Sequence, residues 1–98
     1  MWILRTNTEG FPERVFRLLP GEPKTIGRAT GADFIVDAAL ISRVHCRLTV
    51  LADGALEVKD LDSTNGTFVN GTRVETARVA PGDMIQVGRV EIIAMKEE

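Results

Sequence analysis

Cysteine, aromatic residues and long apolar stretches are scarce in this 98-residue sequence, and each scarcity excludes a class of protein. The single cysteine, Cys46, cannot form an internal disulfide, and its place among alternating apolar residues indicates a core or sheet position. No basic segment precedes a long apolar one, and no stretch approaches the length of a membrane span. We therefore predict a cytoplasmic protein without a membrane partner.

Net charge is also small. The formal net charge is −2 at pH 7, and no basic stripe interleaved with aromatic residues is present. Such a chain has no overall field to hold DNA or RNA, so we expect no nucleic-acid partner. Any site for an anion must be local. Nine of the twelve basic residues are arginine, whose planar guanidinium suits bidentate recognition of an anion.

Short apolar segments alternate with turn residues along the whole chain. No stretch of twelve residues keeps a helical period without a Gly or Pro break. We expect strands at about 2–4, 14–18, 24–26, 34–36, 42–51, 56–60, 67–69, 72–74, 78–79, 84–87 and 90–95. Asn70-Gly71, between two of them, is the residue pair most typical of a tight hairpin. Ten or eleven short strands predict an all-β sandwich in one domain.

One polar stretch, from Asp60 to Gly71, gathers small hydroxyl and amide side chains between apolar segments. It also contains two Asn-Gly pairs, which favour turns. A surface loop of this kind leaves backbone N–H groups and short polar side chains exposed. These are the groups that bind a small anion.

Four short motifs follow one another in the chain: Gly27-Arg28, Ser42-Arg43-Val44-His45, Ser63-Thr64-Asn65-Gly66-Thr67 and Asn70-Gly71. Together with the trailing Pro81-Gly82-Asp83-Met84-Ile85, they resemble the forkhead-associated (FHA) domain, a phosphothreonine-binding family. The resemblance covers about 14–95, so we take 1–98 as a single FHA domain with that core. It implies an FHA/SMAD-like β-sandwich of about eleven strands in two sheets, with the ligand loops at one end and the termini at the other.

The resemblance implies a phosphopeptide site made of Arg28, Ser42, Arg43, Thr64 and Asn65. Arg28 would form a charge-assisted bond to the phosphate, and Ser42 and Thr64 would donate hydroxyls. Asn65 would hold the ligand backbone, and Arg43 would line the phosphate or the peptide. A phosphothreonine carries close to two negative charges and three acceptor oxygens, so it needs such donors.

Other residues would tune or support these loops. Leu40 lies two residues before Ser42, where the family reads the third residue after the phosphothreonine, so a leucine suggests an apolar preference. The residues expected to support the loops are Gly27, His45, Gly66, Asn70 and Gly71. Each role has a plainer alternative, namely a solvated loop arginine, a strand cap or ordinary turn chemistry.

Ser42 and His45 could also be interpreted as the catalytic pair of a hydrolase. On a strand, however, residues three apart point to opposite faces. We therefore expect no catalytic residue, no metal and no cofactor. The sequence predicts a monomeric, non-catalytic signalling module that recognises a threonine-phosphorylated protein or peptide. The alternative is a phosphorylation-independent adaptor module that uses the same sandwich to bind a protein.

Overall fold

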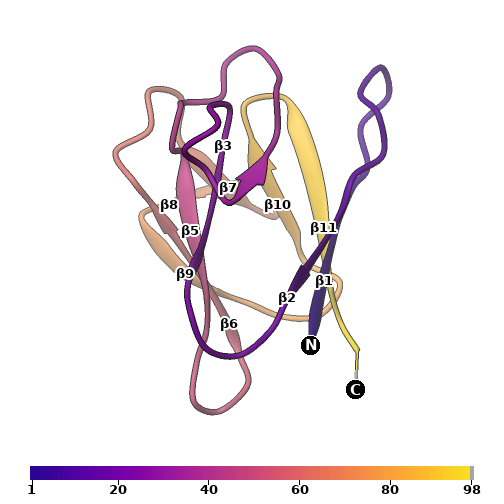
Figure 1. The fold of residues 1–98 in the computed structure, drawn as a ribbon, viewed down its shortest axis with the longest axis vertical. Helices are drawn as coiled ribbons and strands as arrows, with labels where there is room; N and C mark the ends of the chain where they lie inside the picture. Colours follow the sequence, from indigo (N-terminus) through magenta and orange to yellow (C-terminus); the bar gives the residue numbers. More distant parts are fainter. Residues whose placement is uncertain (98) are drawn as a thin grey trace.

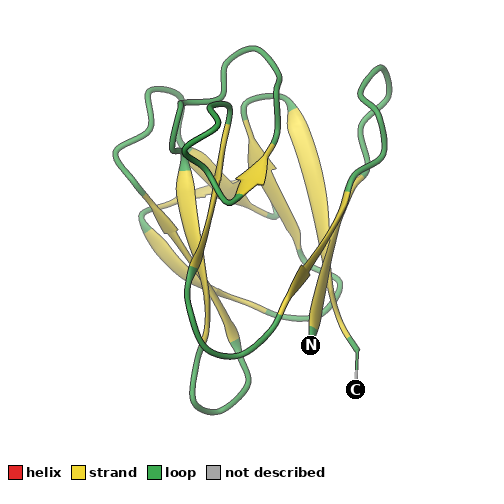
Figure 2. Cartoon of the chain, in the orientation of Figure 1, coloured by secondary structure: helices red, strands yellow, loops and turns green. Residues whose placement is uncertain are grey.

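A computed structural model describes residues 1–97, which form eleven β-strands and no helix (Figure 1, Figure 2). The strands are β1 (Trp2–Thr6), β2 (Val15–Leu18), β3 (Lys24–Gly27), β4 (Phe34–Ile35), β5 (Cys46–Val50), β6 (Leu56–Asp60), β7 (Thr67–Val69), β8 (Thr72–Val74), β9 (Thr76–Val79), β10 (Met84–Val87) and β11 (Val90–Lys96). The predicted all-β fold is confirmed.

The strands form two sheets packed face to face. The six-stranded sheet has the order β2-β1-β11-β10-β7-β8, and the five-stranded sheet has the order β4-β3-β5-β6-β9. Neighbouring strands are antiparallel apart from β3 and β4. Because Trp2 in β1 lies opposite Lys96 in β11, the two chain ends lie together, at the lower end of Figure 1. The loops that follow β3, β4 and β6 lie at the other end.

The inward-facing side chains of both sheets make one apolar core. Its buried members are Trp2, Leu4, Leu18, Ile26, Val36, Ile41, Cys46, Leu48, Leu56, Val58, Val69, Val79, Ile85, Val87, Val90, Ile92 and Ala94. At one side of the sandwich, Phe16 of β2 stacks on Phe34 of β4 with ring centroids 4.8 Å apart. This aromatic pair joins the edge strands of the two sheets.

The hairpin predicted from Asn70-Gly71 is confirmed, since this pair joins β7 to β8. Asn70 has φ of 49° and Gly71 has φ of 84°, the two positive values that a type I′ turn requires. The β5–β6 hairpin likewise turns at Gly54, whose N–H donates to the Leu51 carbonyl at 2.9 Å. Turn chemistry therefore sets the register of both hairpins.

The strand predicted at 42–51 was wrong at its start. Strand β5 begins only at Cys46, and the longest strand is β11 with seven residues. The preceding segment crosses the end of β3 instead of pairing along it: the Arg28 N–H donates to the Ser42 carbonyl and the His45 N–H to the Ile26 carbonyl. The alternating apolar pattern continues through this segment, but the backbone bonds there belong to a loop.

Strands β1 and β9 each extend two residues beyond their predicted ranges, and β3 and β11 each extend one. Strand β1 runs to Thr6, which pairs with Ile92 of β11. On its other side the buried Thr6 hydroxyl accepts the Arg14 N–H at 2.7 Å. Strand β9 begins at Thr76 and pairs with β6. Strand β1 lies outside 14–95 and supplies Trp2 and Leu4 to the core.

Candidate functional site

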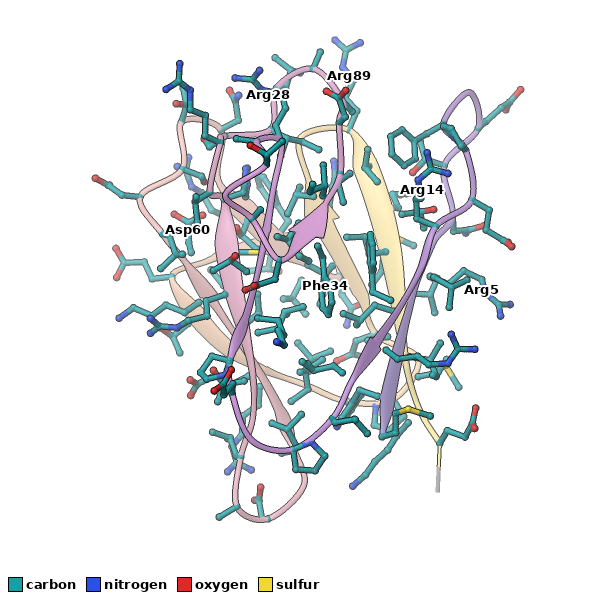
Figure 3. The ribbon with its side chains drawn as sticks, viewed as in Figure 1. Arg5, Arg14, Arg28, Phe34, Asp60 and Arg89 are labelled. Carbon is teal, nitrogen blue, oxygen red and sulfur yellow. The ribbon has the colours of Figure 1, made fainter. Side chains whose placement is uncertain are left out.

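An open pocket of about 540 Å³ lies at the loop end of the sandwich. The loops after β3, β4 and β6 form it, with Arg28, Ala39, Leu40, Ile41, Ser42, Arg43, Thr64 and Asn65 along its walls. Arg28 is at this end in Figure 3. The structure therefore brings together, in one pocket, five residues that the sequence places in three separate motifs, along with Leu40.

Gly27 ends β3 where two backbones meet. A Cβ placed on Gly27 would lie 2.0 Å from the Arg43 carbonyl oxygen, a distance that no side chain can occupy. The absent side chain lets the β4–β5 loop lie directly on β3, with the Arg28 N–H 3.0 Å from the Ser42 carbonyl and the Ala29 N–H 3.2 Å from that of Arg43. This close approach brings Arg28 beside Ser42.

The Arg28 guanidinium is held by one of its five N–H groups. Its Nε–H donates to the Ile41 carbonyl at 3.0 Å, and the side chain is otherwise exposed. No other bond from this guanidinium is formed within residues 1–97, so the terminal amino groups can donate to an incoming anion. One fixed bond also removes part of the rotamer freedom that a ligand would otherwise have to restrict.

Ser42 and Thr64 are linked across the pocket. The Thr64 backbone N–H donates to Ser42 Oγ at 3.1 Å, so the serine oxygen accepts a bond and its own O–H remains available to donate. Thr64 itself is exposed. Two hydroxyl donors therefore face the same space as the Arg28 guanidinium.

Asn65 ties the third loop to the second. Its Nδ2–H donates to the Leu40 carbonyl at 3.0 Å. Leu40 has φ of 71°, an uncommon left-handed conformation for a leucine, and its side chain is 46% exposed. The β10–β11 turn supports this loop from behind, since a Cβ on Gly88 would lie 3.0 Å from the Ala39 carbonyl oxygen.

His45 is buried behind the pocket and joins two loops. Its Nδ1 accepts the Ser42 backbone N–H at 3.0 Å, so the ring proton resides on Nε2, which donates to the Gly66 carbonyl at 2.9 Å. Both ring nitrogens are therefore engaged by backbone groups. The prediction that Ser42 and His45 point to opposite faces of a strand was wrong, because both residues lie in a loop. They still do not form a catalytic pair, because Ser42 Oγ is bonded to the Thr64 N–H and not to the His45 ring.

Gly66 lies at the centre of the β6–β7 loop with φ of 90°. The Arg73 side chain of β8 covers it, since a Cβ there would lie 2.7 Å from Arg73 Nε. Asn70 and Gly71 do not line the pocket. Asn70 is bonded to β10 instead, with its Oδ1 accepting the Met84 N–H at 2.9 Å.

Asp60 is a support of the site that the sequence reasoning missed. Its Oδ1 accepts the hydroxyls of Ser63 at 2.5 Å and Thr67 at 2.7 Å, and its Oδ2 accepts the Ser63 N–H at 3.1 Å. Ser63 Oγ in turn accepts the Gly66 N–H at 2.9 Å. An aspartate three residues before a serine is the sequence signal for such a local turn, and it was present in Asp60-Leu61-Asp62-Ser63.

The electrostatics around Asp60 fit this role. Partial burial alone would raise the pKa of Asp60, but the hydrogen bonds from Ser63 and Thr67 outweigh burial and the pKa is lowered. The neighbouring Cys46 is buried, and loss of water together with the Asp60 charge raises the pKa of its thiol to about 12. Cys46 is therefore an inert core thiol beneath the pocket.

Across residues 1–97, no three His, Cys, Asp or Glu side chains gather in a way that could hold a metal ion. The same residues contain no helix of the length and apolar character needed to cross a membrane. The donors in the pocket are hydroxyl, amide and guanidinium groups, whose chemistry suits an oxyanion.

Comparison with known proteins gives consistent matches. The chain is 39% identical over 82 residues to an ABC transporter ATP-binding/permease protein of Mycobacterium tuberculosis, in a match that covers 84% of this chain and 9% of the transporter. It is 35% identical over 83 residues to the glycogen accumulation regulator GarA of Mycolicibacterium smegmatis, covering 84% of this chain and 52% of GarA. The chain thus spans about half of one relative and a small part of the other.

A solved structure from a structural and functional analysis of phosphothreonine-dependent FHA domain interactions has the same fold. It aligns with a TM-score of 0.88 and 31% sequence identity, over 99% of this chain and 97% of that one. The family model described as FHA domain matches residues 24–88, the range that contains all three pocket loops. These matches confirm the resemblance seen in the motifs, and the chain belongs to the FHA domain family.

Proposed function

We propose that this domain is a non-catalytic module that binds a threonine-phosphorylated peptide or protein in the pocket at the loop end. Arg28, Ser42 and Thr64 bind the phosphate, and Asn65 and Arg43 hold the peptide on either side of it. One observation carries the proposal: three loops place a guanidinium and two hydroxyls around one open pocket.

The pocket chemistry matches a phosphate dianion. A phosphothreonine brings a charge of about −1.5 to −2 at pH 7 and three strong acceptor oxygens. The Arg28 terminal amino groups and the Ser42 and Thr64 hydroxyls are donors. Hydrogen bonds fix the Arg28 side chain at Nε and join Ser42 Oγ to the Thr64 backbone. Charge-assisted bonds of this kind are about twice as strong as neutral ones.

The walls of the pocket suggest how the rest of a peptide is read. Asn65 uses one amide N–H for the Leu40 carbonyl, so its oxygen and second N–H remain for a peptide backbone. The exposed Leu40 side chain provides an apolar contact for a residue after the phosphothreonine. Arg43 is exposed at the rim and adds positive charge there.

The family supports the same function. The solved relative at 31% identity comes from a study of phosphothreonine-dependent interactions, and the chain belongs to its family. The absence of catalysis is supported by His45, whose two ring nitrogens are engaged by backbone groups away from the Ser42 hydroxyl. We place this binding in the cytoplasm, where protein kinases produce phosphothreonine.

The test is binding to a degenerate phosphothreonine-peptide library, followed by titration of the selected peptide in phosphothreonine, phosphoserine and unphosphorylated forms. The wild-type domain is expected to bind the phosphothreonine form selectively. The Arg28→Ala variant is expected to lose this binding. Arg47→Ala is the matched control, because Arg47 lies on β5 outside the pocket. Equal binding to the phosphorylated and unphosphorylated forms would contradict the proposal and favour an adaptor module.

A further inference from the structure

The outward faces of the two sheets differ in chemistry. On the five-stranded sheet, the outward rows set by the strand register are Thr25, Arg47, Lys59 and Thr76, then Thr49, Glu57 and Arg78. All of these are polar or charged, as expected for an antiparallel sheet that faces water on one side. This face has the ordinary alternation of a solvated sheet.

The six-stranded sheet breaks that rule at β1, β10 and β11. Strand β11 reads Val90-Glu91-Ile92-Ile93-Ala94-Met95, with apolar residues on both of its faces. Pairing puts Ile3 opposite Met95, and Ile93 between Arg5 and Met84. We call Ile3, Met84, Ile93 and Met95 the apolar face. Apolar residues on both sides of a strand are typical of strands covered on both sides.

The apolar face is open and hollowed. Met95 is 48% exposed, and Ile3, Met84 and Ile93 are half-buried. A hollow of about 440 Å³ has Ile3, Ile93 and Met95 as its apolar lining, and Arg5, Asn7, Lys96 and Glu97 complete it. A concave apolar surface fits an inserted side chain better than it fits the flat surface of a lipid bilayer.

Two arginines flank the apolar face without carboxylate partners. Arg5 lies next to Ile93 and Arg17 lies opposite Ile3, on the same side of the sheet. Within residues 1–97 the ion pair Arg78–Asp53 is the single one, so neither Arg5 nor Arg17 is paired. Figure 3 shows Arg5 projecting outward from the sandwich. A partner for this face therefore needs carboxylates beside its apolar side chains.

A second copy of this chain meets that need less well than a more acidic partner, because its own face carries more cations than carboxylates. Two apolar faces related by a two-fold axis would bring the same cations into one interface, and like charges placed close together oppose association. Each copy would bring three cations, Arg5, Lys96 and Arg17, but only two carboxylates. These are Glu97 at the hollow and Glu91, which pairs with Gln86 at the far end of the face from Arg17. The charges of the face thus favour a different protein over self-association.

We propose that the apolar face is a second binding surface, separate from the loop pocket, for a partner segment that is apolar and acidic. A bulky apolar side chain of that segment fills the hollow beside Ile93 and Met95, and its carboxylates pair with Arg5 and Arg17. This binding needs no phosphate and proceeds when Arg28 is replaced.

The test uses a phage-displayed library of unphosphorylated 16-residue peptides selected on the whole chain. Selected peptides are expected to combine Leu, Phe or Trp with Asp or Glu. Their affinity should fall at least about tenfold on Met95→Glu, consistent with burial of one large apolar side chain. It should stay within about twofold on Arg28→Ala and on Thr49→Glu, which places the same charge on the outward face of the other sheet.

A charge swap gives the sharper result. The double variant Arg5→Glu, Arg17→Glu should lose the selected acidic peptides and bind versions in which their Asp and Glu are replaced by Lys. Ile93→Thr serves as a second apolar variant, and thermal unfolding of all variants checks that they fold. Selection of no peptide, loss of binding on Arg28→Ala, or selection without acidic residues would overturn the proposal. So would Met95-dependent dimerisation or Met95-dependent flotation with phosphatidylserine vesicles.

Discussion

The loop pocket and the apolar face are both open to a partner, but they are built in opposite ways. In the pocket, hydrogen bonds between loops hold three of the five side chains. Arg28 donates to the Ile41 carbonyl, Ser42 Oγ accepts the Thr64 N–H, and Asn65 donates to the Leu40 carbonyl. On the apolar face, side chains such as Ile93 and Met95 are positioned by strand register alone. A pocket for an anion needs directed donors, whereas an apolar contact needs area and shape.

This difference predicts how each region responds to mutation. Removal of one donor from the pocket should be severe, because the charge it neutralises is left without a partner. Removal of one contact from the apolar face should have a graded effect in proportion to the area lost. The predictions below begin with the largest expected effect.

The largest effect is expected from Arg28→Ala. Hydrogen bonds to charged groups contribute about 1.5–3 kcal/mol each, so loss of two should weaken phosphopeptide affinity about 100-fold or more. Isothermal titration calorimetry at two salt concentrations measures the phosphopeptide affinity of the wild type and of the variant. Met95→Glu is the comparison variant and should leave this affinity within about twofold, as expected for a surface change outside the pocket. A loss of similar size in Met95→Glu would show that the two regions are not independent.

Gly27→Ala should destabilise the fold and the pocket together. The new Cβ would lie 2.0 Å from the Arg43 carbonyl oxygen, so the β4–β5 loop must move away from β3. Overpacking of this kind destabilises by about 1–3 kcal/mol. Urea unfolding gives the change in stability, and peptide titration gives the change in affinity. The open Gly31 is the control, because an alanine there meets no atom within 4 Å.

Asp60→Asn should weaken the β6–β7 loop in a pH-dependent way. Because the folded-state pKa of Asp60 is lowered, its carboxylate stabilises the fold above the unfolded-state pKa of about 3.9. That contribution is lost as the pH falls through the folded-state pKa. At pH 7 the variant should be less stable by about 1–2 kcal/mol, as for hydrogen bonds to a charged group.

Urea unfolding of wild type and Asp60→Asn from pH 7 down to pH 3 measures this difference, which should shrink below about pH 4. Asp53→Asn is the comparison variant at the opposite, termini end of the sandwich. The Ala55 N–H and Arg78 also lower the pKa of Asp53, but its side chain is exposed and solvent screening should make its effect on stability smaller. If the difference in unfolding free energy between wild type and Asp60→Asn stayed constant with pH, the carboxylate charge of Asp60 would not be what holds Ser63 and Thr67.

The smallest effect is expected at Cys46, which lies in the core beneath the pocket. With its pKa raised to about 12, roughly one thiol in ten thousand is ionised at pH 8. Iodoacetamide should therefore leave the folded protein unlabelled over hours and label it quickly in urea. The same assay applied to Arg28→Ala and Met95→Glu reports whether either region disturbs the core. Rapid labelling of the native wild type would contradict the burial of this thiol.

Much of the fold follows from local sequence signals. Asn70-Gly71 and Asp53-Gly54 have the turn chemistry of hairpins, and the short apolar segments around them are strands. The signal failed at Ser42 to His45, where apolar alternation continues into a loop. There the backbone groups bond to β3, which is distant in the chain, and to the side chain of His45. A local sequence pattern encodes neither contact.

The candidate site was predicted by resemblance more than by pattern. No periodicity in the sequence brings Arg28, Ser42 and Thr64 together, since their convergence depends on the order β4-β3-β5-β6 of strands within the five-stranded sheet. The support from Asp60 was missed because its hydroxyl partners, Ser63 and Thr67, are themselves ordinary turn and strand residues. The apolar face was missed for a related reason: which side of β11 faces the core is decided by the other sheet.

The most direct test of the account is an NMR titration of the ¹⁵N-labelled domain with a library-selected phosphothreonine peptide. The account predicts that the largest shifts occur at the backbone amides of Ser42, Thr64 and Asn65 and at the Arg28 Nε–H, while Ile93 and Met95 are unmoved. The unphosphorylated peptide should cause no shifts in the pocket. Shifts that appear equally with the unphosphorylated peptide, or that are centred on the apolar face, would contradict the central claim that the three loops form a phosphothreonine site.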